Sequence, residues 1–355
     1  MSSLFTPLAL RAVTLPNRVA LAPMCQYSAG PDGLPTDWHR VHLGARAVGG
    51  VGLVITEATA VVPEGRISPQ DTGLWSAAHV DAWRPVTAFV AAQGAVPAVQ
   101  LAHAGFKAST YRPWAEHRGG VPDAEGGWTP VGPGAKPFVP EYRVPTALDD
   151  AGLAGVVEAF ATAAGRAVDA GFAAVEIHAA HGYLLHEFLS PLTNHRADGW
   201  GGDRAGRMRL TLAVARAVRA AVGENVPVLA RISATDWTED GWTVEDSVVL
   251  AGELAAAGVD LVDASSGGAS ARAAIPVGPG YQVPLAARIR REAGVPTGAV
   301  GLIVEPEQAE QIVAGGEADL VLLGRELLRD PYWPRRAAAK LGAAPSWPAQ
   351  YARAL

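Results

Sequence analysis

The stretch "LAGVVEAFATAAGRAVDAGFAAVEIH", residues 153–178, joins a helical pattern to a short strand pattern. From Leu153 to Ala167, apolar residues recur at spacings of three and four, which places them on one face of a helix. Gly171 can end that helix, and "AAVEIH" (173–178) then has the composition of a buried strand. The segment predicts a helix followed directly by a strand, and the number of times this unit repeats decides the fold.

The same alternation runs through the rest of the chain. Further helical patterns lie near 38–49, 79–93, 204–222, 243–257, 282–293, 306–314 and 325–340. The strand patterns are "RVALAP" (18–23), "GLVITE" (52–57), "VPAVQL" (96–101), "AAVEIH" (173–178), "PVLARI" (227–232), "DLVDAS" (260–265), "VPTGAV" (295–300) and "DLVLLG" (319–324). Eight such units predict an α/β fold, a parallel (β/α)8 TIM barrel. A doubly wound open sheet is the alternative, and the lack of a G-x-G-x-x-G after the first strand disfavours it.

The domain organisation follows from the same reading. No break in composition divides the chain, so we expect a single barrel domain over residues 1–355. We also expect an N-terminal β-hairpin before the first barrel strand. The connection 103–146, rich in Pro, Gly and Trp, follows the third strand. A connection of this length is usually functional, and we expect it to lie over the C-terminal face of the barrel as a lid.

Composition excludes several classes of protein. The 355 residues carry a net charge of −6, so no basic surface indicates nucleic acid or an anionic membrane as partner. Cys25 is the only cysteine, which excludes an intrachain disulfide and a cysteine-rich zinc site. The N-terminal residues lack the pattern of a signal peptide, and no apolar run reaches the ~18 residues of a membrane span. We expect a cytoplasmic protein.

The C-terminal ends of the predicted strands should carry the chemistry, because barrel enzymes place their active sites there. A Schiff-base aldolase would need a lysine at a strand end, but Lys107, Lys136 and Lys340 lie elsewhere. A magnesium site would need carboxylates on successive strands, whereas the third, fourth and fifth strands end in Gln100, His178 and Arg231. The residues at the strand ends therefore exclude both a Schiff-base aldolase and a magnesium site of this kind.

What remains is a polar site suited to a cofactor with amide edges and a phosphate. Gln100 can donate and accept hydrogen bonds, as the pyrimidine edge of a flavin requires, and Arg231 can stabilise negative charge on the ring. Gly301, Gly324 and Arg325 follow the last two strands, where barrels commonly bind phosphate.

Alternation along the strands indicates which side chains reach the barrel interior. On the fourth strand, Glu176 and His178 should point inward, and on the fifth strand Leu229 and Arg231 should do so. We expect Glu176 to be structural and to pair with a cation such as Arg231. Asp263 is expected to be a structural residue of the barrel.

His178 and His181 admit several interpretations. They can be core histidines, metal ligands or proton carriers, and Tyr183 can be a packing residue. Metal binding is disfavoured because helical ligand pairs are spaced i, i+4 and no thiolate or carboxylate completes the set. Two N–H donors aimed at one carbonyl oxygen fit best, since donors in a dry site stabilise negative charge that grows on such an oxygen. Tyr183, with an ordinary pKa near 10, would stay protonated and could supply a proton.

Six motifs in register resemble the old yellow enzyme family of FMN-dependent ene-reductases. They are "APMCQYSA" (22–29), "QLAHAG" (100–105), "VEIHAAHGYLLHEFLSP" (175–191), "ARISATDW" (230–237), "PTGAVGLI" (296–303) and "LVLLGREL" (320–327). The likeness runs from about residue 4 to 355, and the cysteine in "PMC" is similar to that of the thermophilic-like branch. The resemblance implies non-covalent FMN as cofactor, with NADPH or NADH as transient reductant.

The resemblance also implies roles for individual residues. Tyr27, His178 and His181 would contact the substrate, and Tyr183 would be the proton donor. Arg353, in the C-terminal "SWPAQYARAL", would reach the neighbouring active site in a homodimer or a dimer of dimers. Cys25 would touch the flavin ring and tune its potential. The FMN contacts would be Ala22, Pro23, Met24, Cys25, Ala58, Gln100, Arg231, Gly324 and Arg325, joined by Gly301 from its place after the seventh strand.

Three positions depart from the family pattern, namely Phe106, His195 and Trp200. The expected reaction is NAD(P)H-dependent reduction of the activated C=C bond of an α,β-unsaturated carbonyl compound, in two half-reactions that share one site. Two alternative functions remain compatible with the sequence. One is a cofactor-free barrel lyase or isomerase with His178 as base, and the other is a flavin-binding barrel without turnover.

Overall fold

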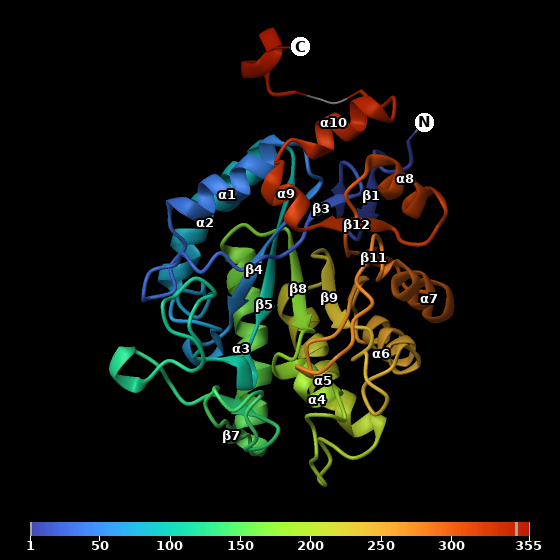
Figure 1. Ribbon diagram of the computed structural model, residues 1–355. Coiled ribbons are helices and arrows are strands. Elements are labelled where there is room, and N and C mark those ends of the chain that lie inside the picture. The colour runs from blue at the N-terminus through green and yellow to red at the C-terminus, as the bar shows by residue number, and fades with distance from the viewer. Residues whose placement is uncertain (1, 345–346, 355) are drawn as a thin grey trace.

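The computed structural model describes residues 2–344 and 347–354, and its centre is a closed parallel barrel of eight strands (Figure 1). Each strand pairs with the next along the chain, and β12 pairs with β3 to close the ring. The predicted (β/α)8 barrel is confirmed. The strands are β3 (Val19–Leu21), β4 (Leu53–Ala60), β5 (Val96–Ala102), β8 (Ala174–Ala179), β9 (Val228–Ser233), β10 (Leu261–Ser265), β11 (Thr297–Ala299) and β12 (Leu320–Leu323).

Helices surround the barrel at nearly the predicted positions. The one wrong prediction is the helix 325–340, which is two helices. Pro331 has no N–H to donate and disfavours helical backbone at Asp330, whose φ of −139° and ψ of 89° end the first helix. The helices are α1 (Asp37–Val48), α2 (Ala77–Ala92), α3 (Asp150–Asp169), α4 (Leu184–Leu189), α5 (Arg204–Val222), α6 (Val244–Ala256), α7 (Val283–Ala293), α8 (Pro306–Ala314), α9 (Arg325–Arg329) and α10 (Trp333–Lys340).

Smaller elements lie outside the barrel. The predicted N-terminal hairpin is present as β1 (Leu8–Leu10) and β2 (Val13–Leu15), which pair antiparallel. The long connection after β5 holds the short pair β6 (Val131–Gly132) and β7 (Thr146–Ala147). Single 3-10 turns occur at η1 (Pro63–Gly65), η2 (Gly105–Lys107), η3 (Asp123–Glu125) and η4 (Ala349–Ala354).

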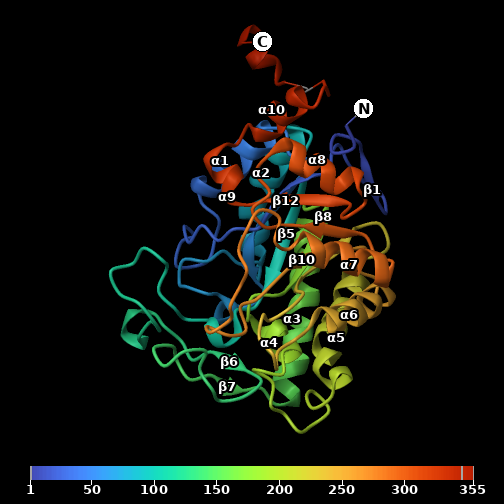
Figure 2. The same cartoon turned by 45° about the vertical axis from the view of Figure 1, so that its right-hand side comes forward.

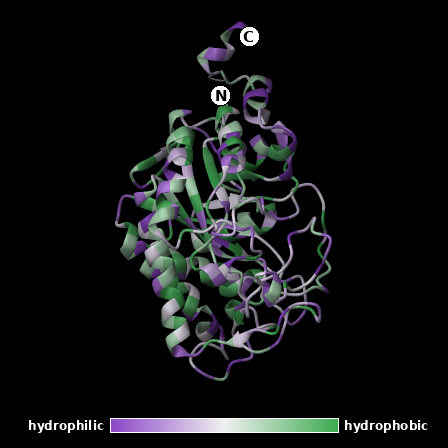
Figure 3. Ribbon diagram, turned by 90° about the vertical axis from the view of Figure 1, so that its left-hand side faces the viewer, coloured by the Kyte–Doolittle hydropathy of each residue, from purple (hydrophilic) through white to green (hydrophobic). Residues whose placement is uncertain are grey.

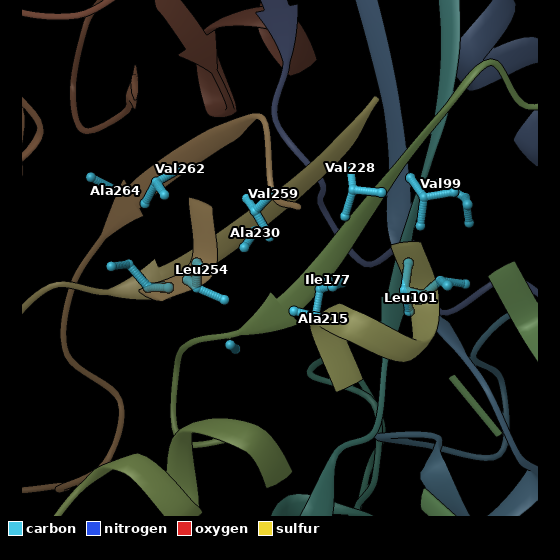
Figure 4. Close-up of a cluster of buried hydrophobic side chains, with 14 of the residues drawn as sticks. Val99, Leu101, Ile177, Ala215, Val228, Ala230, Leu254, Val259, Val262 and Ala264 are labelled. Carbon is cyan, nitrogen blue, oxygen red and sulfur yellow. The ribbon is translucent and has the colours of Figure 1, made fainter. Parts of the chain in front are cut away.

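The alternation of the strands divides the apolar residues between two cores. Outward-facing side chains such as Ile177 and Ala230 pack against the helices (Figure 4). Inward-facing Ala174, Leu229 and Leu261 fill the barrel interior. The predicted inward direction of Leu229 is confirmed. The helices carry both hydrophobic and hydrophilic residues along their length (Figure 3), as expected for elements with one face on the core.

Helix α3 is, among the described residues, the one helix long and apolar enough to cross a membrane by length and composition. Its apolar side, with Leu153, Phe160 and Ala164, is buried in the core of the barrel protein. The helix therefore packs one face against the barrel and leaves the rest at the surface.

The loops after the strands gather on one side of the barrel. In Figures 1 and 2, β7 and α4 lie at the bottom, while both chain ends lie at the top. The long connection after β5 thus covers the C-terminal face of the barrel, as its length and position predicted.

Candidate active site

A layer of buried polar residues lies inside the barrel above its apolar interior. His178, Arg231 and Asp263 are register partners on β8, β9 and β10, so their side chains enter the barrel at one level. Arg231 Nε lies 3.1 Å from Asp263 Oδ2. Glu176 instead accepts a hydrogen bond of 2.8 Å from Gln100 Nε2. The expected pairing of Glu176 with Arg231 was therefore wrong, because Asp263 is the register neighbour of Arg231 and takes that place.

The turn from β8 to α4 brings His178, His181 and Tyr183 together. The ring centroid of His178 lies 5.1 Å from that of His181 and 5.0 Å from that of Tyr183, each in an edge-to-face arrangement. His181 has a φ of +63° and Gly182 one of +70°, so the backbone turns sharply between the two histidines. A Cβ at position 182 would overlap the main-chain oxygen of Gly268, which is why glycine stands there.

The protonation of this trio follows from burial. Burial, and then the charge of Arg231, hold the pKa of His178 and of His181 well below the usual value, so both rings are neutral. Ala180 N–H donates to His178 Nδ1 over 3.3 Å, which leaves the proton of that ring on Nε2. Burial raises the pKa of Tyr183 well above its usual value and keeps the phenol protonated.

Hydrogen bonds from neighbouring strands fix His181. Its N–H donates to Ser233 Oγ over 2.9 Å, and its Nε2 lies 2.7 Å from Ser265 Oγ. Its main-chain oxygen accepts a 2.7 Å hydrogen bond from Lys107 Nζ, which also donates to Gly268 over 2.7 Å. Burial lowers the pKa of Lys107 to about 8. The sequence analysis gave Lys107 no role, since the residue lies beyond the strand end.

A second buried network supports Gly182 and the start of α4. Gly182 N–H donates to His186 Nδ1 over 2.8 Å, and His186 Nε2 lies 3.1 Å from Asp236 Oδ1. The other oxygen of Asp236 accepts from Ser190 Oγ over 2.6 Å. These residues carry no strand-end signal in the sequence, so only the structure identifies them.

Cys25 and Tyr27 face the trio from the loop after β3. Both pack with Tyr183 around the small buried residues Ala104 and Ala108. Burial raises the pKa of the Cys25 thiol, so Cys25 is a neutral thiol in this site. Gln26 N–H donates to Glu57 Oε2 over 2.8 Å, which anchors the loop between the two side chains.

A cavity of about 520 Å³ lies beside Tyr27 and Tyr183, and we name it the substrate cavity. Its remaining wall comes from the long connection, including Lys107, Phe138 and Tyr142. The lid predicted for residues 103–146 thus lines the space in which a substrate would sit.

A smaller cavity of about 190 Å³ lies at the ends of β11 and β12, and we name it the phosphate cavity. Gly301, Gly324 and Arg325 line it, together with Tyr281 and Gln282, which the sequence analysis did not single out. Gly301 has a φ of +121°, and a Cβ there would lie 2.9 Å from the Tyr281 ring. The glycine leaves room for a group that binds close to the backbone.

These features fit a flavin mononucleotide. The phosphate cavity supplies an arginine and close backbone approach, as a phosphate requires. Gln100 and Arg231 are buried on β5 and β9, the two strands that flank β8 with His178, and Ala58 is the register partner of Gln100. Ala22 follows β3, and its neighbour Met24 lies against Gly324. Among the described residues, no group of three or more His, Cys, Asp or Glu side chains is placed to hold a metal ion.

The remaining predicted positions lie outside this arrangement. Arg353 lies in η4, is exposed, and belongs to the C-terminal tail, which lies at the top of Figure 1, whereas β7 of the long connection lies at the bottom. The ring centroids of Phe106 and Phe138 lie 5.4 Å apart. Trp200 Nε1 donates a hydrogen bond of 2.8 Å to Asp150 Oδ1. His195 is exposed. Arg353 therefore does not reach the active site of its own chain.

Comparison with curated proteins gives full-length relatives. The chain is 47% identical over 351 residues to a protein named NADPH dehydrogenase from Geobacillus sp. (strain WCH70). This alignment covers 99% of this chain and 98% of the relative. It is 45% identical over 355 residues to an NADPH dehydrogenase from Listeria monocytogenes, covering 100% of this chain and 99% of the relative.

Solved structures with the same fold include two named reductases. An old yellow enzyme homologue from Zymomonas mobilis aligns with a TM-score of 0.80 at 28% identity, covering 98% of both chains. Morphinone reductase in complex with tetrahydroNAD aligns with a TM-score of 0.79 at 29% identity, covering 98% of this chain and 93% of that one. Residues 3–343 match the profile of one family. The chain therefore belongs to the NADH:flavin oxidoreductase / NADH oxidase family, as an old yellow enzyme-type member.

Proposed function

We propose that this enzyme binds one FMN and reduces the activated C=C bond of α,β-unsaturated carbonyl compounds, with NADPH as the reductant. The observation that supports the proposal is the grouping of two neutral imidazoles with one protonated phenol, whose rings lie about 5 Å apart, next to Arg231 on the neighbouring strand. The names of the curated relatives favour NADPH, and NADH is the alternative reductant.

The side chains around the site would have separate roles in binding the cofactor. Gln100 and Arg231 would hold the flavin ring, and Gly301, Gly324 and Arg325 would hold its phosphate. Met24, Cys25 and the alanines at 22 and 58 would contact the ring. When bound, FMN supplies the hydride that passes to the β-carbon, and it takes that hydride from the reductant.

His178 and His181 would bind the carbonyl oxygen of the substrate. His178 Nε2 carries a proton that it can donate, and His181 would donate from Nδ1, with its Nε2 accepting the hydroxyl proton of Ser265. Neutral donors in a buried site stabilise the charge that grows on the oxygen as the double bond is reduced. Tyr183 would deliver its proton to the α-carbon, and Tyr27 would pack against the substrate from the opposite loop.

The cellular setting is part of this proposal. The single thiol, Cys25, is free and next to the reacting groups, and a reducing cytoplasm preserves such a thiol. We also propose a homodimer or a dimer of dimers, in which Arg353 of one chain reaches the active site of another.

An anaerobic titration followed by absorption spectroscopy tests the function. The purified, FMN-saturated protein should show a flavin spectrum, lose it on addition of NADPH, and regain it on addition of cyclohexenone. A chain that takes up no FMN contradicts the proposal and favours a cofactor-free lyase or isomerase with His178 as base. A flavin that NADPH does not bleach, or that cyclohexenone does not restore, favours a binding protein without turnover.

A further inference from the structure

A third cavity, of about 830 Å³, adjoins the substrate cavity, and we name it the cationic cleft. Three loops of the C-terminal face form it, with lining residues in the ranges 133–140, 192–196 and 269–272. Phe138 lines both this cleft and the substrate cavity. The two spaces therefore lie next to each other and share the ring of Phe138 as part of their walls.

The lining of the cleft is positively charged. Lys136, His195, Arg196 and Arg272 line it, and no aspartate or glutamate is among its described lining residues. Arg196 is already paired with Asp198. Lys136 and Arg272 form no ion pair with any residue that the structure describes, and both are exposed. In a chain with a net charge of −6, this local excess of cations indicates an anionic ligand.

The floor of the cleft is apolar and aromatic. Phe106 and Phe138 lie 5.4 Å apart at its inner end, and prolines of the long connection continue the wall. Such a surface can hold a flat ring, while the cations above it hold phosphates. Phosphate groups attached to a planar base combine both features.

The cleft is tied to the reacting groups by direct contacts. Lys107 Nζ, which holds the main-chain oxygens of His181 and Gly268, lies 4.0 Å from the centre of the Phe138 ring. Ala269, the residue after Gly268, is buried and lines the cleft. A ligand in the cleft is therefore next to the histidine turn, at the open side of the substrate cavity.

We propose that the cationic cleft binds the phosphorylated adenosine end of the reductant and that Lys136, His195 and Arg272 select NADPH over NADH by binding its 2′-phosphate. This inference rests on the proposed function. The cleft has a volume typical of a ligand site, about 300–1,000 Å³, and the substrate cavity takes the nicotinamide end. Arginine and lysine donate strong, charge-assisted hydrogen bonds to phosphate.

The first test compares both nucleotides in the double variant Lys136→Ala/Arg272→Ala. Losing charge-assisted bonds to the phosphate should raise the KM for NADPH by about 10- to 100-fold. The KM for NADH and the kcat with either nucleotide should stay near those of the unaltered enzyme. Lys136→Arg should keep the NADPH preference, because it keeps the charge. An unchanged ratio of the two KM values in the double variant overturns the proposal.

Two exposed cations far from the cleft give matched controls. Lys340 lies on α10, where it pairs with Glu307, and Arg216 lies on the outer helix α5. The variant Lys340→Ala/Arg216→Ala removes the same total charge as the test variant. If it shifts the NADPH preference as much as the test variant does, the effect is one of net charge, and the specific site is wrong.

A binding measurement separates this inference from the proposed function. Adenosine 2′,5′-bisphosphate should bind the FMN-saturated protein in calorimetry, and the double variant Lys136→Ala/Arg272→Ala should weaken it, whether or not hydride transfer occurs. Coenzyme A, which carries the same chemistry with a 3′-phosphate, serves as the second probe. If the variant weakens the binding of coenzyme A but not that of adenosine 2′,5′-bisphosphate, the cleft binds the coenzyme A part of an acyl thioester substrate. That result overturns the assignment to NADPH.

Discussion

Lys107, a largely buried residue at the start of the lid, donates a hydrogen bond of 2.7 Å to the main-chain oxygen of His181. A buried ammonium is costly unless it is well paired, and here its partners are two carbonyl oxygens, from His181 and Gly268. Lys107 therefore joins the catalytic turn to the loop after β10. It acts as a positioning residue, since it holds the backbone from which His181 projects.

Lys107→Met should lower kcat for enone reduction by about tenfold or more, because two buried carbonyls lose a donor at ~1–3 kcal/mol each. Burial lowers the pKa of Lys107 to about 8, so raising the pH above that value removes its positive charge. The turnover rate of the unaltered enzyme should fall above about pH 8. The pH–rate profile of the variant should lack this decrease. Steady-state rates between pH 6 and 9.5, at matched FMN content, check this. A decrease in rate above pH 8 that persists in the variant would show that another ionisable group causes it.

His178→Ala or His181→Ala should slow the reoxidation of the flavin by cyclohexenone about 10²- to 10³-fold, as expected for the loss of one oxyanion donor. Reduction by NADPH should suffer less, since no enone is present in that step. Stopped-flow absorbance measures the two half-reactions separately. Reoxidation at the unaltered rate in both variants would show that the histidines do not bind the carbonyl.

The pH dependence of stability follows from the same histidines. Their folded pKa lies well below the unfolded value near 6.5, so below that pH the unfolded chain binds more protons. The free energy of unfolding should therefore decrease as the pH falls below about 6.5. Urea unfolding of the FMN-saturated protein at pH 7.5 and pH 5 should show a smaller loss in the variant His178→Asn/His181→Asn. An equal loss in both proteins would assign the effect to other groups.

Tyr183→Phe should slow reoxidation by about 10²–10⁴ for substrates that need a proton at the α-carbon. Burial raises the pKa of Tyr183, so the rate that depends on it should not fall between pH 7 and 10 through loss of this proton. Tyr142→Phe, in the same cavity, is the matched control and should keep the unaltered rate. Equal rates for the two variants would exclude Tyr183 as the donor.

Arg353→Ala should raise the KM for the enone and leave FMN content and oligomer mass unchanged. In the structure this arginine is exposed and lines none of the three cavities described above, so we expect its effect to require a partner chain. Mixing this variant with a His178→Ala/His181→Ala chain should restore substrate affinity in the mixed dimers, because there each intact pair of histidines faces an intact Arg353. A monomer by light scattering, or unchanged kinetics on truncation before Tyr351, would contradict the shared site.

The barrel and the strand-end residues were predictable because both depend on local patterns. Alternation along β8 and β9 placed His178 and Arg231 inside, and parallel pairing then brought them to one level. The pairing of Glu176 was not predictable, since Glu176 and Asp263 are both inward-facing carboxylates near Arg231, and strand register decides that Asp263 pairs with Arg231 while Glu176 accepts from Gln100. Lys107 and Asp236 escaped notice for the same reason, because their contacts join segments far apart in the chain.

The reacting trio occupies one short turn of the chain, whereas most of the substrate cavity wall belongs to the connection between β5 and α3. The two parts meet at Lys107, which donates to the main-chain oxygen of His181 and lies 5.7 Å from the centre of the Tyr183 ring. Changes at Tyr111, Tyr142 or Phe138 can therefore alter the size of molecule that is admitted without moving the proton donor. In evolution or in the laboratory, the range of compounds that this enzyme accepts can diversify by substitution in one surface segment, while the chemistry is inherited unchanged.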